Sequence, residues 1–177
     1  MSAAILEAAA TVLAEDGEQA SMADVAAAAG MARATVYRYF PNREALFEAL
    51  GRLAVEDAGE RLEAGRLQDV PVPEAFERAV RALVAVGDYL VVVSRQDARS
   101  DSGEFEQRVA APLRELVERA QSSGEVRDDL PASWLMESLI GIVVSGLQTR
   151  PSLGVEDTVA GITSLFLDGA RLAARSR

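Results

Sequence analysis

Residues 21–46 read SMADVAAAAGMARATVYRYFPNREAL, and this stretch decides the fold. Gly30 divides it into two short segments whose apolar residues recur every three or four positions, the spacing of one helix face. Ser21, followed three residues later by an acid, has the pattern of a capping box, in which a hydroxyl meets a free backbone N–H at a helix start. Pro41 and Asn42 end the second segment and cap the helix that follows. The stretch therefore predicts two short helices joined by a tight turn, with a longer helix behind them.

Two short helices across a glycine turn are typical of a helix-turn-helix, whose second helix enters the major groove of DNA while the first braces it. Residues that face inward must be apolar, and Val25, Val36, Tyr39 and Phe40 are predicted to do so. Residues that face outward should donate hydrogen bonds to phosphates or base edges. Four residues of the second segment fit that role: Arg33, Thr35, Tyr37 and Arg38.

The charge distribution both favours and opposes a DNA-binding protein. The chain of 177 residues has 18 arginines, no lysine, 28 acidic residues and a net charge of −10. From Met31 to Arg43, however, it carries three arginines and no acid. A basic island on an acidic chain attracts phosphate locally while the rest discourages non-specific binding. The net charge is the best argument for an alternative, a helical ligand-binding or adaptor protein without DNA binding.

The composition excludes several kinds of chemistry. The chain has no Cys and no His, which excludes disulfides, thiolate nucleophiles, imidazole bases and the usual zinc sites. A carboxylate-pair enzyme is not excluded, but no acidic cluster stands beside a Gly-rich loop and there is no phosphate-loop pattern. We therefore expect no enzyme, no cofactor and no metal. No apolar run approaches the roughly 18–20 residues that span a bilayer, and we expect a cytoplasmic, bacterial protein.

The string from Ala29 to Leu46, with ILEAA at residues 5–9 and SMADVA at residues 21–26, resembles the signature of the TetR/AcrR family of transcriptional regulators. The turn glycine, the Tyr-x-Tyr-Phe block and the cap followed by Arg43 fall at the family's offsets, and the resemblance covers residues 5–50. It implies an all-α protein that acts as a ligand-responsive repressor, with a homodimer on a palindromic operator. An activator on the same scaffold would differ only in promoter position.

The resemblance also implies roles in DNA binding. Arg33 and Thr35 would face base edges, with Ala34 between them in van der Waals contact. Tyr37 and Arg43 would contact phosphates, and Arg38 would lie near the DNA backbone or a base. Ser21 would cap its helix near a phosphate. Two positions depart from the family pattern. Ala34 stands where glycine is frequent, and Ala32 stands where Ser or Thr is frequent, so Ala32 supplies no hydroxyl to cap its helix.

The rest of the chain reads as helices at about 43–65, 73–95, 104–122, 131–149 and 155–175, with a polar loop at 94–104. We expect a helix-turn-helix domain at 1–46 and a helical ligand-binding and dimerisation domain at 47–177. The resemblance implies a dimer through the last two helices. Our interface candidates lie on their apolar stripes, which would otherwise form the monomer core: Leu139, Ile142, Val143, Gly146, Val159, Ile162 and Phe166.

An inducer pocket in the body is implied by the resemblance, but the sequence singles out few residues for it. Small-molecule pockets are mostly apolar, so the candidates are the bulky residues, each of which also fits a simple core role: Phe76, Tyr89, Phe105, Trp134 and Met136. No charged residue stands inside an apolar run of the sequence. We therefore expect a neutral or hydrophobic small molecule.

Overall fold

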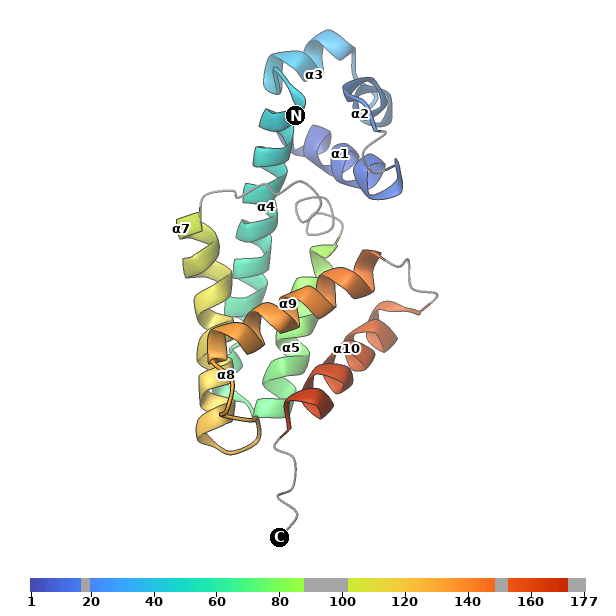
Figure 1. Cartoon of the computed structure of the whole chain (residues 1–177). Helices are drawn as coiled ribbons and strands as arrows, with labels where there is room; N and C mark the ends of the chain where they lie inside the picture. Colours follow the sequence, from blue (N-terminus) through green and yellow to red (C-terminus); the bar gives the residue numbers. More distant parts are fainter. Residues whose placement is uncertain (17–19, 88–101, 149–152, 172–177) are drawn as a thin grey trace. The chain divides into compact units, whose positions relative to one another are not determined.

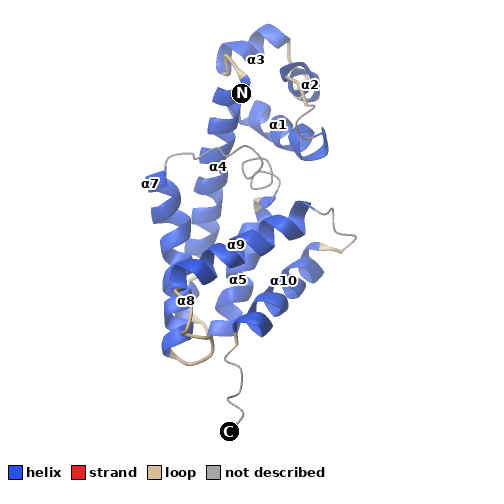
Figure 2. Cartoon of the chain, in the orientation of Figure 1, coloured by secondary structure: helices blue, strands red, loops and turns tan. Residues whose placement is uncertain are grey.

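The computed structural model describes residues 1–16, 20–87, 102–148 and 153–171. Within these ranges every element is a helix, as Figure 2 shows, and the all-α prediction is confirmed. The described residues form two compact units. We call Met1–Ala54 the head, and Val55–Gly87 with residues 102–171 the body. Helix α4 (Arg43–Ala64) belongs to both. The expected functional boundary after residue 46 stays a prediction.

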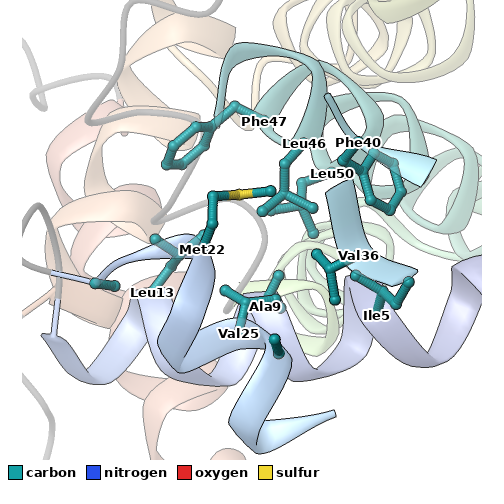
Figure 3. Packing of buried hydrophobic residues seen from close by; sticks show 13 residues of the cluster. Ile5, Ala9, Leu13, Met22, Val25, Val36, Phe40, Leu46, Phe47 and Leu50 are labelled. Atoms are coloured by element: carbon teal, nitrogen blue, oxygen red, sulfur yellow. The ribbon is translucent and has the colours of Figure 1, made fainter. Parts of the chain in front are cut away.

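The head contains α1 (Ser2–Asp16), α2 (Met22–Ala28), α3 (Arg33–Tyr39) and the first turns of α4 (Figure 1). Its helices close around one apolar cluster, which Figure 3 shows from close by. The largest side chains in that cluster are fully or almost fully buried: Ile5, Leu13, Val25, Val36, Phe40, Leu46, Phe47 and Leu50. This cluster fixes the position of α3, because Val36 is its one fully buried residue.

Local signals in the sequence set the helix ends of the head. The predicted capping box is present: the Ser21 hydroxyl accepts from the Asp24 N–H at 3.3 Å, and the Asp24 carboxylate accepts from the Ser21 N–H at 2.9 Å. Gly30 has φ +64°, in the left-handed region that favours glycine. The Asn42 side chain accepts from the Ala45 N–H at 2.8 Å and caps α4.

The body is built on α5 (Val72–Ala85), which packs against α8, α9 and α10. The chain reaches α5 through a short 3₁₀ turn, η2 (Leu67–Asp69). The remaining elements are α7 (Ser102–Phe105), the π-helical turn η3 (Glu106–Ala110), α8 (Ala111–Ser122), α9 (Ala132–Gln148) and α10 (Val155–Ala170). Figure 1 shows α5 among the last three helices. The predicted helix at 73–95 is described only as far as residue 87.

Two arginines hold the turn between α4 and α5. Arg78 donates to the Gly65 carbonyl at 2.8 Å, and Arg119 donates to the Leu67 and Gln68 carbonyls at 2.8 and 3.0 Å. These carbonyls follow the end of α4, where no helical partner exists for them. The C-terminal end of α4 is therefore fixed to α5 and α8 by hydrogen bonds as well as by packing. No helix among the described residues is long and apolar enough to cross a membrane.

Candidate DNA-binding interface

Helix α3 carries an exposed side that holds most of the predicted DNA-binding residues. Arg33, Ala34 and Arg38 are exposed, and Tyr37 is 48% exposed. Because residues three and four apart share a helix face, these side chains lie on one side of α3, opposite the buried Val36. Thr35 is half-buried at the edge. The structure thus brings the expected residues together, and their contacts with DNA stay a prediction.

Ser21 is exposed at the start of α2, but both of its donors are occupied. Its N–H and its hydroxyl both donate to Asp24 Oδ2, at 2.9 and 2.6 Å. These bonds lower the pKa of the Asp24 carboxyl below its ordinary value, and the nearby charge of Arg33 lowers it further. Asp24 therefore stays ionised and is bound to the end of α2. The Ser21 hydroxyl proton is not available to a phosphate in this arrangement.

Tyr39 does not lie where the sequence predicted. We expected it in the core, but it is 39% exposed, and the Arg38 guanidinium lies 5.5 Å from its ring centroid. The reason is that α3 ends there and Phe40, with an extended backbone, fills the core instead. An exposed tyrosine beside Arg38 extends the candidate interface by one residue that sequence reasoning missed. The Tyr-x-Tyr spacing favoured the wrong assignment, because a residue two positions after an outward-facing one is expected on the other side of a helix.

Two further positions complete the candidate interface. Arg43 is half-buried at the first turn of α4, with its guanidinium 5.1 Å from the Phe47 ring centroid. That contact orients the third arginine of the basic island. Ala32, at the N-cap of α3, forms no side-chain cap, as expected for alanine. Among the described residues, no carboxylate lies within ion-pair distance of Arg33 or Arg38.

Comparison with known proteins supports the same segment. Residues 5–50 match the model of the tetR family of bacterial regulatory proteins. Residues 5–50 are a TetR-family domain. The chain is a transcriptional regulator and not an enzyme, so the prediction from residues 21–46 is confirmed at the level of function.

Relatives of this chain are similar over most of its length. It is 29% identical to the HTH-type transcriptional repressor LfrR of Mycolicibacterium smegmatis over 145 residues, which are 82% of this chain and 76% of LfrR. It is 24% identical to the fatty acid metabolism regulator protein of Bacillus subtilis over 150 residues, 78% and 77% of the two chains. The crystal structure of LfrR from Mycobacterium smegmatis with proflavine superposes with a TM-score of 0.78 at 25% identity, covering 98% of each chain.

The predicted interface residues of α9 and α10 need correction. Five of the seven are buried inside the single chain, with at most 7% of their surface exposed: Leu139, Val143, Val159, Ile162 and Phe166. Of these five, Ile162 lines the hollow described below, whereas the other four have almost no surface to offer a second protomer. They form the body core, where the ring centroids of Phe166 and Phe76 lie 5.3 Å apart. Only Ile142 and Gly146 stay partly exposed.

The exposed sides of α9 and α10 enclose an open hollow of about 530 Å³. Its lining includes the small residues Gly141, Ser145 and Gly161, and Leu165 at its edge is 65% exposed. At Gly146 an added Cβ would lie 3.3 Å from Ile162, so glycine permits the close approach of the two helices beneath the hollow. This regulator therefore has an apolar, exposed face on its last two helices, to which the predicted Ile142, Gly146 and Ile162 contribute together with residues that were not predicted.

The predicted pocket residues do not form one group. Phe76 and Met136 are buried in the body core, and Phe105 is half-buried. Trp134 is 53% exposed, which contradicts its placement in an internal pocket. The periodicity of α9 explains this, since Trp134 lies on the same helix face as the hollow-lining Ser138 and Gly141. Tyr89 lies outside the described residues.

Proposed function

We propose that this regulator is a repressor that binds a palindromic operator as a homodimer and releases it when a small molecule occupies the body. The observation that carries the proposal is the exposed side of α3, where Arg33 and Arg38, beside Tyr37, form no ion pair with any residue in the described part of the chain. Two such helices reading successive major grooves would lie about 34–36 Å apart. The relative LfrR is named a repressor, and its structure holds proflavine, which supports both repression and a ligand. A protein that acts on bacterial DNA works in the cytoplasm.

The direct test is selection of bound sequences from random DNA, followed by footprinting. We expect an enriched palindrome whose half-sites are spaced by about one helical turn. The variants Arg33→Ala and Tyr37→Phe should weaken binding to that sequence. Arg52→Ala is the matched control, because Arg52 is exposed on α4 outside the basic island. If no sequence is enriched at low salt, the chain is a ligand-binding or adaptor protein and the proposal fails.

The homodimer is proposed through the exposed face of α9 and α10. A self-complementary patch on two adjacent helices suits a two-fold interface. The exposed side chain of Leu165 could enter the glycine-lined hollow of a second protomer, and the leucine of that protomer could enter the hollow of the first. Leu165→Glu should give a monomer by sedimentation velocity. Val155→Glu is the control, since Val155 is 60% exposed but does not line the hollow. A Leu165→Glu variant that stays dimeric, or a dimer lost with Val155→Glu, would place the interface elsewhere.

Control by a ligand requires two states of the dimer with different ligand affinity, since a ligand shifts an equilibrium only by that difference. Helix α4 is one continuous element from the basic island to the body, so a change at its body end reaches Arg43 without crossing a linker. We expect operator release to be accompanied by thermal stabilisation of the DNA-free protein by the same compound. A compound that releases DNA without stabilising the free protein would act on the DNA interface instead.

A further inference from the structure

Arg108 occupies an unusual position in the body. It lies in the π-helical turn η3, between α7 and α8, and its side chain rests on Gly59 of α4. A Cβ added to Gly59 would lie 2.8 Å from Arg108 Nε and 2.9 Å from Arg108 Cβ. No real side chain tolerates such distances, so only glycine permits the guanidinium to lie on this side of α4. Gly59 is itself buried.

The Nε atom of Arg108 is buried and has no hydrogen-bond partner. A buried donor without an acceptor costs stability, and native structures keep few of them. The two terminal nitrogens are not among the buried atoms without a partner, and no hydrogen bond or ion pair holds them. The residue as a whole is half-buried. Arg108 therefore has its Nε closed off against α4 and its two terminal nitrogens directed to accessible space.

The other arginines of the body behave differently. Within its described part, seven of them pair with a carboxylate: Arg61, Arg66, Arg78, Arg81, Arg114, Arg127 and Arg171. An eighth, Arg119, binds backbone carbonyls. Arg108 has no such partner, although the chain has an excess of acids and Arg114 nearby holds Glu106 at 2.8 Å. A half-buried cation in an acidic body that forms no ion pair has no evident structural role.

The backbone conformation at Arg108 also indicates a functional position. Residues Glu106–Ala110 form a π-helical turn, whose backbone hydrogen bonds span one residue more than those of the α-helix on either side. Such turns are uncommon and occur often at functional sites. The turn shifts the register of the helix and places Arg108 over Gly59, while Val109 and Ala110 enter the core. Near Gly59 on α4, Ala58 and Leu62 are apolar and buried, and Glu56 and Glu63 are exposed.

We propose that Arg108 binds the carboxylate of an amphiphilic ligand in the body, through its two terminal nitrogens. Guanidinium and carboxylate match in a two-point geometry, and a single negative charge balances the single cation. A dianionic phosphate would leave an unbalanced charge beside apolar residues of α4 and η3. The apolar residues next to Arg108 in η3 and next to Gly59 in α4 favour a hydrocarbon for the part of the ligand that follows the carboxylate. This inference rests on the proposed control by a ligand. It changes the expected ligand from a neutral molecule to a hydrophobic one with a single carboxylate at one end.

The probe is octanoate, with octanamide as the neutral molecule of the same length. Binding is measured by calorimetry and by thermal stabilisation of the full chain without DNA. We expect octanoate to bind wild type and octanamide to bind at least about tenfold more weakly, because a hydrogen bond to a charged group is roughly twice as strong as a neutral one. Arg108→Gln should remove the difference between the two probes. Arg114→Gln, which removes a paired arginine of the same segment, should preserve it.

Two further variants separate binding from structure. Arg108→Gln without ligand should be as stable as wild type, because the native Nε forms no hydrogen bond; a large loss of stability would mean a structural role and would overturn the proposal. If Arg108→Gln does not fold, Arg108→Lys serves, because it keeps the charge without the two-point geometry and should bind octanoate several-fold more weakly. Gly59→Ala should weaken octanoate binding by displacing Arg108. Equal binding of both probes by wild type, or no octanoate binding, overturns the carboxylate site.

Failure of this site is distinguishable from failure of the proposed function. The binding measurements use DNA-free protein, whereas the proposed function is tested by operator selection. An enriched operator together with no preference for octanoate would leave the repressor intact and remove the carboxylate site. A clear octanoate preference without any selected operator would keep the site and remove the repressor.

Discussion

The head and the body treat their arginines differently. In the described body, seven arginines pair with carboxylates, whereas no carboxylate of the described residues lies within ion-pair distance of Arg33 or Arg38 of the head. The difference is meaningful because the head is also acidic, with seven carboxylates among residues 1–50. An arginine already paired within the protein must lose that partner before it binds phosphate. We expect Arg33 and Arg38 to be available to phosphate on a chain of net charge −10 because neither forms an ion pair with a described acid.

The largest effect on DNA affinity is expected when Arg33, which forms no ion pair within the described residues, is removed from the head. Arg33→Ala should weaken binding to the selected operator on the order of ten- to a hundredfold, since a two-point contact with a base is worth about 1–3 kcal/mol. Arg127→Ala, which removes a body arginine paired with Asp129, should leave the affinity unchanged. Fluorescence anisotropy with labelled operator measures both. Equal losses would show that net charge, and not the island, drives binding.

Salt dependence tests whether the island binds phosphate. Each phosphate neutralised contributes about 0.9 to the slope of log affinity against log salt. Arg43→Ala should therefore lower the slope by about one unit for each protomer in which residue 43 no longer neutralises a phosphate. The control Arg52→Ala should not change it. An unchanged slope for Arg43→Ala would assign that residue a packing role against Phe47 instead.

Ser21 explains why Asp24 does not pair with Arg33 although the two are close: the Ser21 N–H and hydroxyl donate to the Asp24 carboxylate. Ser21→Ala removes the cap and should cost about 0.5–2 kcal/mol of stability in urea unfolding. It also frees the Asp24 carboxylate to pair with Arg33, as acids do in the body, so operator affinity should fall several-fold. The double variant with Asp24→Asn should recover the affinity but not the stability. If affinity and stability fall and recover together, Asp24 does not compete for Arg33.

The sequence predicted the head far better than the body, for a physical reason. The ends of α2 and the turn at Gly30 depend on local interactions, which a short string of residues encodes. The two sides of α9 depend on distant neighbours: its apolar periodicity shows a stripe but not whether the stripe meets α5 or a second chain. Leu139 and Val143 were therefore assigned to the wrong surface. Arg108 was missed because a π-helical turn breaks the spacing on which helix faces are predicted.

The smallest expected effect concerns the pH dependence of the head. Hydrogen bonds from Ser21, and then the charge of Arg33, lower the pKa of Asp24 from 3.8 in the folded protein. Because the folded pKa is lower than the unfolded one, this stabilisation is present above 3.8 and is lost as the pH falls through the folded pKa. Wild type should therefore lose more stability on acidification than Asp24→Asn, measured as urea midpoints across that range. The control Asp129→Asn removes a carboxyl whose pKa Arg127 lowers in the body. This control should change how the urea midpoint of the body depends on pH, and it should leave the pH dependence of the head as in wild type. If Asp24→Asn and Asp129→Asn change the pH dependence of the urea midpoint identically, neither carboxyl belongs to a separate unfolding unit.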